Sequence, residues 1–436
     1  MEKTAEDKIG LWTCTSLVIG NMIGSGVFLL PSTLAIYGGI SIVGWLISTV
    51  GAFTLAILFS YLSKAMPSVG GPYAYTREGL GDFAAFLVAW GYWISIWCGN
   101  AAITVAFVSY LNVFFPILAT NSLAAVSVGL SAIWGLTWVN SRGIKTAGHV
   151  QLITTILKLA PLSMMAVFGL FYVDWHNFIP FNRSQETNLR AIASTATLTL
   201  WAYLGMESAT VPANNVENPE KTIPKATLFG TAITAFVYIF GTIAVMGLIP
   251  ADVLKNSGAP YADSAAIIWG ETARKIMALG AIIATFGALN GWILMQGQVP
   301  FAMSKDKLFP SVFGKVNSNG VPISGIIISS ILLSIIMTMN FSKTLVEQFK
   351  FMILLSTLTV LIPYLFSAAS FILIMKKQNL VLQKGRVIKL SVAFFAFAYS
   401  LWAVAGSGQE VVYWGFILLM LGVPIFIFMK YKSVDS

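Results

Sequence analysis

Long uninterrupted apolar runs constrain the fold of this chain more than any other feature of its sequence. The first extends from Leu11 to Ala35, and about twelve runs occur in all, most near the 20 residues that a helix needs to cross a bilayer. Strands of a membrane β-barrel would instead alternate over about ten residues. We predict an all-α integral membrane protein surrounded by lipid, with spans at 11–35, 39–64, 83–114, 122–140, 147–173, 191–212, 226–249, 265–297, 322–340, 347–375, 387–406 and 410–430.

Composition and charge agree with a multi-pass membrane protein. Only 10% of the residues are charged, against roughly a quarter in soluble domains. The net charge of +9 does not indicate nucleic acid binding, because the basic residues lie mostly in loops at the ends of the apolar runs. These residues are more numerous on the side that holds the N-terminus, which predicts two cytoplasmic termini and the inner (plasma) membrane as location. The charged start and the long first run argue against a cleavable signal peptide.

The chain offers no arrangement of residues that is typical of catalysis or metal binding. Its only cysteines are Cys14 and Cys98, and its only histidines are His149 and His176. Their spacing suits neither a metal site nor a nucleophile with its base, and the phosphate-binding Gly-x-x-x-x-Gly-Lys loop is missing from the sequence. We therefore expect a protein that is not an enzyme and needs no cofactor or metal.

A small-residue segment, Gly24-Ser25-Gly26, lies inside the first apolar run. It predicts a break in the helix at mid-membrane, where the freed backbone amides must face a polar partner. A surface for close helix packing is the alternative interpretation.

The sixth apolar run carries a second interruption, in which Gly205 is followed by Glu207. A carboxylate at this depth must face a cavity, find a partner or be protonated, so a structural role and a substrate or proton role are both open. Because the two interruptions lie five spans apart, they predict a transporter built from inverted repeats with its site between the broken helices. Half-helix N-termini attract anions and C-termini attract cations, which suits the zwitterionic head of an amino acid.

Several motifs resemble those of the amino acid–polyamine–organocation (APC) superfamily of permeases. They are Gly24-Ser25-Gly26-Val27-Phe28, Pro67-Ser68-Val69-Gly70-Gly71-Pro72-Tyr73-Ala74-Tyr75, Gly205-Met206-Glu207-Ser208 and Asn218-Pro219-Glu220-Lys221-Thr222-Ile223-Pro224. Gly291-Trp292 and Gly406-Ser407-Gly408-Gln409-Glu410-Val411 are similar to the basic amino acid/polyamine antiporter subgroup, which includes the arginine/agmatine antiporter.

This resemblance implies a LeuT-type fold with about 12 transmembrane helices, the first and sixth of them broken. A single transporter domain would span residues 1–436, with inverted repeats at 11–173 and 191–375 and two additional C-terminal helices at 387–430. It also implies alternating access and, in many members, a homodimer.

The resemblance further implies roles for single residues. In this family one backbone segment holds the substrate carboxylate. The matching residues here are Ile23, Gly24, Ser25 and Gly26, with Asn21 beside them. Carbonyls that would accept from the substrate ammonium lie near Trp201, Ala202 and Leu204. A cationic side chain would stack on Trp292, near the polar groups of Asn100 and Ser356. The gating residues would be Tyr92, Trp201, Glu207 and Tyr364. Pocket positions that differ from the arginine antiporter are Ser95, Ile96 and Ile103, so the resemblance does not fix arginine as the substrate.

Lys158 lies within the fifth apolar run, too deep to reach the membrane surface easily. Burial favours the neutral form of an amine, so this lysine could release a proton during transport. Many proton-coupled members of the superfamily carry a lysine at the matching position, where sodium-coupled relatives bind sodium, whereas the arginine/agmatine antiporter lacks it. A permanently charged bridge between the first and fifth helices is the alternative. Together with Glu207, Lys158 is the candidate for proton coupling.

The function expected from these features is secondary active transport of a cationic or neutral amino acid, linked to protons. An obligatory amino acid/polyamine exchanger is the alternative mechanism. A membrane scaffold or channel without coupled transport is the alternative class, but a channel would show pore-lining rings, and a scaffold would not need two broken helices.

Overall fold

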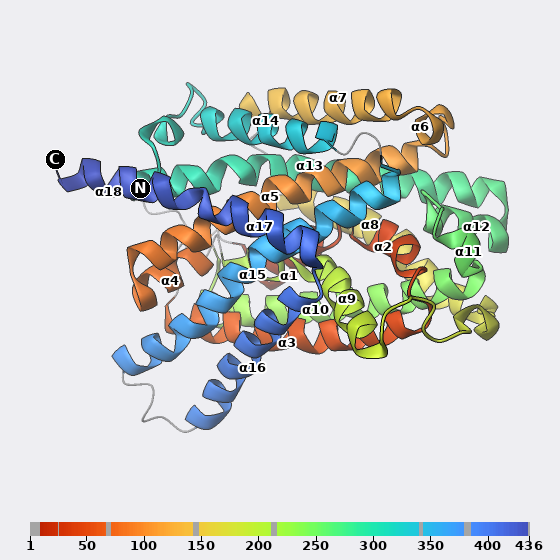
Figure 1. Ribbon diagram of the computed structural model, residues 1–436, viewed down its shortest axis with the longest axis horizontal. Helices are drawn as coiled ribbons and strands as arrows, with labels where there is room; N and C mark the ends of the chain where they lie inside the picture. The colour runs from red at the N-terminus through yellow and green to blue at the C-terminus, as the bar shows by residue number, and fades with distance from the viewer. Residues whose placement is uncertain are drawn as a thin grey trace.

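The computed structural model describes residues 9–24, 26–66, 71–142, 148–210, 216–339, 343–378 and 385–434. Within these ranges the chain is helical, and its only β-type pairing is an isolated bridge between Ile9 and Val216. Most of the long helices run along the long axis of an elongated bundle (Figure 1). Nine helices of the described chain are long and apolar enough to cross a membrane, which confirms the predicted all-α membrane protein.

These spans are formed by α1 with α2, by seven single helices, and by α17 with α18. Their bounds are α1 Leu11–Met22, α2 Gly26–Leu34, α3 Ile40–Ala65, α5 Asp82–Leu111, α7 Ser122–Ser141, α10 Pro219–Leu248, α13 Glu271–Lys305, α15 Leu345–Lys377, α16 Arg386–Ala405, α17 Gln409–Met420 and α18 Gly422–Val434. The three other expected spans correspond to α8 Gly148–Phe168, α9 Asn188–Leu200 and α14 Ile323–Met339. Short helices join them: α4 Pro72–Leu80, α6 Ile117–Thr120, α11 Ala251–Leu254 and α12 Pro260–Trp269.

Helix α5 lies at the centre of the bundle, where it packs against α13 and α15 (Figure 1). Almost every residue of α5 from Ala84 to Tyr110 is buried. A helix that is apolar on all sides is expected to be buried in this way. Polar side chains on α5 therefore point into the protein, where only other helices or an internal cavity can provide partners.

Both predicted helix breaks are present. α1 ends at Met22 and α2 begins at Gly26, while α9 ends at Leu200 and is followed by two short 3-10 helices, η4 (Trp201–Tyr203) and η5 (Met206–Thr210). Gly205 between these 3-10 helices has φ +98°, a conformation that favours glycine. An added Cβ there would lie 3.2 Å from the Cβ of Asn21, so glycine also allows the two breaks to approach each other.

The eighth span differs from its expected bounds of 265–297. The structure ends α12 at Trp269 and starts α13 at Glu271, because Gly270 between them has φ +82°. A left-handed glycine stops one helix and reorients the chain before the next. The long apolar run therefore forms two helices, and α13 continues to Lys305 instead of ending near residue 297.

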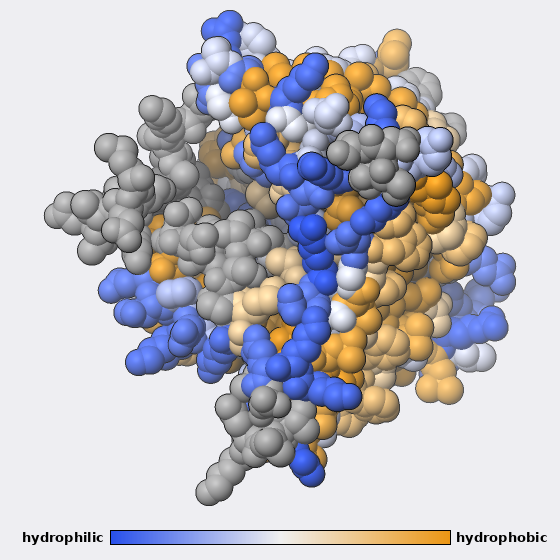
Figure 2. Space-filling model, turned by 90° about the vertical axis from the view of Figure 1, so that its left-hand side faces the viewer, coloured by the Kyte–Doolittle hydropathy of each residue, from blue (hydrophilic) through white to orange (hydrophobic). Residues whose placement is uncertain are grey.

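The end of the bundle that holds α4 and α18 is polar. Arg77 of α4 forms ion pairs with Asp82 (3.1 Å) and Asp306 (3.2 Å), and Lys430 of α18 pairs with Asp82 (2.7 Å). Tyr73 donates to Asp306 at 2.7 Å, and burial together with this carboxylate raises the pKa of the phenol, which therefore remains a donor. Figure 2 shows hydrophilic residues gathered in a band on this face, with hydrophobic surface beside it.

Candidate functional site

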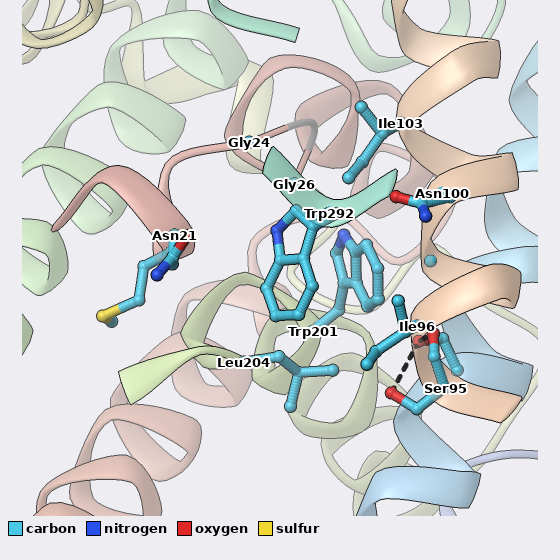
Figure 3. Close-up of a pocket in the computed structure, with 13 residues that line it drawn as sticks. Asn21, Gly24, Gly26, Ser95, Ile96, Asn100, Ile103, Trp201, Leu204 and Trp292 are labelled. Atoms are coloured by element: carbon cyan, nitrogen blue, oxygen red, sulfur yellow. Dashed lines mark hydrogen bonds between the residues drawn. The ribbon is translucent and has the colours of Figure 1, made fainter. Parts of the chain in front are cut away.

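A small cavity of about 40 Å³ lies where the two helix breaks meet α5, α13 and α15 (Figure 3). It is lined by Asn21, Met22, Gly24, Gly26, Ser95, Ile96, Gly99, Asn100, Ile103, Trp201, Leu204, Trp292 and Ser356. Mostly apolar walls with a few polar groups are typical of sites that bind small molecules.

Glycines allow the broken segments and the Trp201 ring to lie close together. A Cβ added to Gly26 would lie 3.1 Å from Cδ1 of Trp201 and 3.2 Å from Cα of Ala202. A Cβ added to Gly99 of α5 would lie 2.8 Å from Cη2 of the same indole. Gly24 is less confined, since its nearest neighbour would be the Ala288 methyl at 3.5 Å. The position of Trp201 therefore requires glycine, which has no side chain, at Gly26 of α2 and at Gly99 of α5.

Neighbouring helices supply donors to the carbonyls at the end of α1. The Lys158 ammonium on α8 lies 3.1 Å from the Gly20 carbonyl and 3.4 Å from the Ile23 carbonyl. Tyr238 on α10 donates its hydroxyl to the Met22 carbonyl at 2.7 Å. A helix C-terminus leaves carbonyls without helical partners and carries partial negative charge, so a buried cation here stabilises the break.

On the opposite side, α5 and α15 present polar groups. The Ser356 hydroxyl donates to the Ser95 carbonyl at 2.7 Å, and the two hydroxyls lie 3.2 Å apart. Asn100 is fully buried and donates through Nδ2 to Gln296, while its Oδ1 has no hydrogen-bond partner among the described residues. Figure 3 shows this oxygen on the side of the two indoles, Trp201 and Trp292, which both point into the cavity. Asn100 therefore offers an acceptor to a ligand.

Glu207 is held outside the cavity by two phenols. Its carboxylate accepts from the Tyr92 hydroxyl on α5 and from the Tyr364 hydroxyl on α15, each at 2.9 Å. The carboxylate is fully buried, and so is Tyr364. These hydrogen bonds join η5, in the second break, to α5 and α15. If η5 moves relative to either helix, the hydrogen bond between Glu207 and the tyrosine of that helix must break.

Replacing Tyr364 by phenylalanine is expected to lower the thermal unfolding temperature and to slow transport. The change leaves one buried oxygen of Glu207 without its donor, which costs about 1–3 kcal/mol. Tyr413→Phe is the matched control, because Tyr413 is 61% exposed. Thermal unfolding of the purified proteins and initial uptake rates measure the effect. If the two variants behave alike, the hydrogen bond from Tyr364 does not hold the break.

The structure brings most of the predicted substrate-binding residues together around this one cavity. Ile23 and Ala202 are not among its lining residues, and the Ile23 carbonyl instead accepts from Lys158. Ser25 lies outside the described residues. The gating residues Tyr92, Glu207 and Tyr364 form their own cluster, and their roles in transport remain predictions.

Sequence reasoning missed three residues of this region, and each depends on a neighbouring helix. Gly99 leaves space for Trp201, Tyr238 donates to the end of α1, and Gln296 contacts Asn100. Only Gln296 carried a local signal, since Pro300 follows it by four residues and leaves its carbonyl without a helical donor. A free carbonyl inside a membrane helix must find a partner on another helix.

The described residues contain no group of three or more His, Cys, Asp or Glu side chains that could hold a metal ion. The groups that line the cavity are suited to binding a ligand. Two helix breaks lie on one side, hydroxyl and amide groups lie on the other, and two indoles point into the cavity. A binding cavity between two broken membrane helices is the arrangement found in secondary transporters.

A sequence profile of the amino acid permease family matches residues 9–428, and the chain therefore belongs to that family, a member of the APC superfamily. It is 37% identical over 331 residues to the cadaverine/lysine antiporter of Escherichia coli (strain K12), covering 76% of this chain and 74% of that protein. It is 32% identical over 428 residues to the putrescine transporter PotE of Haemophilus influenzae, covering 98% of each chain. PotE of Escherichia coli (strain K12) is also 32% identical, over 431 residues. The predicted superfamily and antiporter subgroup are thus confirmed.

Proposed function

We propose that this permease exchanges a cationic amino acid for a diamine across the cell membrane by alternating access. The observation that carries the proposal is the cavity itself, with two helix breaks on one side and an unpaired acceptor, Asn100 Oδ1, on the other. The names of the relatives, which include a cadaverine/lysine antiporter and a putrescine transporter, support substrates of this class.

In this proposal the amino acid lies between the breaks and α5. Its carboxylate faces the N-terminus of α2 at Gly26, where the partial positive charge of the helix favours an anion. Its ammonium faces backbone carbonyls near Trp201 and Leu204. The distal cation stacks on Trp292 and donates to Asn100 Oδ1, and a cation against an indole contributes about 0.5–2 kcal/mol. A diamine has an ammonium at each end and uses the distal contacts without the carboxylate contact.

Proton-linked transport is a second candidate, supported by Lys158. Lys158 is 3% exposed, and its ammonium bridges α8 to the Gly20 and Ile23 carbonyls at the end of α1. If the ammonium releases its proton, the bridge weakens and the break is free to move. This would couple the position of α1 to protonation. A permanently charged bridge is compatible with the same contacts and predicts exchange without a response to pH gradients.

The predicted internal organisation is part of the proposal. Residues 11–173 and 191–375 form the two inverted repeats, each beginning with a broken helix, and residues 387–430 add two helices. The ends of α4 and α18 lie at the same end of the bundle in Figure 1, opposite α11 and α12. We assign this end to the cytoplasm, and a homodimer is the proposed assembly.

Purified protein in liposomes tests the exchange directly. Labelled L-lysine is expected to enter vesicles preloaded with cadaverine or L-lysine, and to remain at the level of protein-free vesicles when the lumen is empty. The two preparations differ only in the internal substrate, so the comparison isolates exchange. Accumulation of L-lysine in empty vesicles under an imposed pH gradient would overturn obligatory exchange and favour proton-linked uptake.

A further inference from the structure

The contacts of Gln296 on α13 define which way its side-chain amide faces. Its Nε2 group donates to the Ile326 carbonyl at 3.2 Å and to the Ser330 hydroxyl at 2.9 Å, both on α14. A backbone carbonyl can only accept, so the NH₂ group of Gln296 must face α14. Its Oε1 must then face α5, where it accepts from Asn100 Nδ2 at 2.8 Å.

The main chain of Gln296 is fixed as well. Pro300 lies four residues later in α13 and has no N–H, so the Gln296 carbonyl lacks its helical donor. It accepts instead from Trp93 Nε1 at 3.1 Å and from the Ser329 hydroxyl at 3.2 Å. Gln296 is fully buried. The backbone carbonyl and the side-chain amide of Gln296 therefore both form hydrogen bonds to α5 and α14, and these bonds fix the orientation of the amide.

The consequence reaches the cavity through Asn100. Because Gln296 presents an oxygen, Asn100 must donate with its Nδ2, and its Oδ1 is left for the cavity. A flipped Asn100 would present NH₂ to the ligand and set two amide oxygens against each other. The network from α14 through Gln296 thus determines that the cavity offers an acceptor, and not a donor, at this position.

We propose that Gln296 is a positioning residue that sets the polarity of the distal substrate site, so that it selects ligands ending in a hydrogen-bond donor such as a primary ammonium. The inference rests on the proposed function, because it assumes that the distal end of the substrate lies at Asn100. Gln296 itself does not line the cavity, and it acts only through the orientation of Asn100.

The test compares two ligands that differ only in the distal group. L-lysine ends in an ammonium, whereas L-norleucine has the same chain without it. Their dissociation constants are measured with purified protein, using the fluorescence of the cavity indoles. In Gln296→Leu, Asn100 loses its fixed orientation, and L-lysine is expected to bind about tenfold more weakly. Binding of L-norleucine should change little, because the head-group contacts are untouched.

Gln298→Leu is the matched control, since Gln298 lies on the same helix but is exposed. It should keep the wild-type preference for L-lysine. Ser330→Ala is a milder variant that removes one of the two acceptors for Gln296 Nε2, and a smaller loss of the same preference is expected from it. Equal weakening of both ligands in Gln296→Leu, or an unchanged preference in both variants, would show that Gln296 is only structural. A wild-type protein without preference for L-lysine over L-norleucine would instead overturn the proposed cationic substrate.

Discussion

Replacing Lys158 by methionine is expected to remove any response of uptake to an imposed pH gradient and to slow exchange about tenfold. The Gly20 and Ile23 carbonyls lose their buried donor, and an unpaired buried carbonyl costs about 1–3 kcal/mol. The end of α1 then loses both its hydrogen bonds and the positive charge opposite its partial negative charge. Methionine has a similar length and flexibility, so the change mainly removes the ammonium and keeps the packing.

Lys158→Arg separates the two roles that the ammonium could have. A guanidinium stays protonated in proteins, so arginine can bridge α8 to α1 but cannot release a proton. With proton coupling, the arginine variant should exchange L-lysine in preloaded liposomes while failing to respond to a pH gradient. The ratio of uptake with and without the gradient measures this response. An arginine variant whose ratio matches that of the wild type would leave Lys158 as a structural bridge.

The fold was largely predictable because its main determinants are local. Continuous apolar runs predicted membrane helices, and clustered small residues predicted the break at Gly24 to Gly26. The break after Leu200 was likewise visible from Gly205 and Glu207 within an apolar run. The boundary at Gly270 was not, because glycine is tolerated inside membrane helices and its sequence gives no sign of a positive φ.

The site was predictable only in part, since its contacts join residues far apart in the sequence. The resemblance to a known family placed Ser95, Asn100, Trp292 and Ser356 around one cavity, and composition alone could not have chosen among so many aromatic and small residues. The sequence around Tyr238 gives no sign of its role, because its hydrogen bond to the Met22 carbonyl exists only once α10 packs against α1. Side chains that contact the lining residues of a site, and not the cavity itself, can be identified only when the relative positions of whole helices are known.

Adding a methyl group at Gly26 is expected to reduce exchange about tenfold, and valine at this position to abolish it. The new Cβ would lie 3.1 Å from Cδ1 of Trp201 and 3.2 Å from both its Nε1 and the Ala202 Cα. Two of these atoms belong to the indole and one to the backbone of η4, so the break in the sixth span must shift. Overpacking of this kind costs typically about 1–3 kcal/mol, and a bulkier side chain adds to it.

Gly24→Ala is the matched control for this prediction, because it adds the same methyl group two residues earlier in the same break. Its Cβ would meet the Ala288 methyl at 3.5 Å and Cδ1 of Ile103 at 3.9 Å, which are ordinary contact distances. Exchange of L-lysine in preloaded liposomes should therefore fall less in Gly24→Ala than in Gly26→Ala, although both residues line the cavity. Equal rates in the two variants would mean that the contact between Gly26 and Trp201 is not needed for transport. A difference between them would place the functional requirement at the point where the two breaks touch, and not in the general flexibility of the glycine-rich segment.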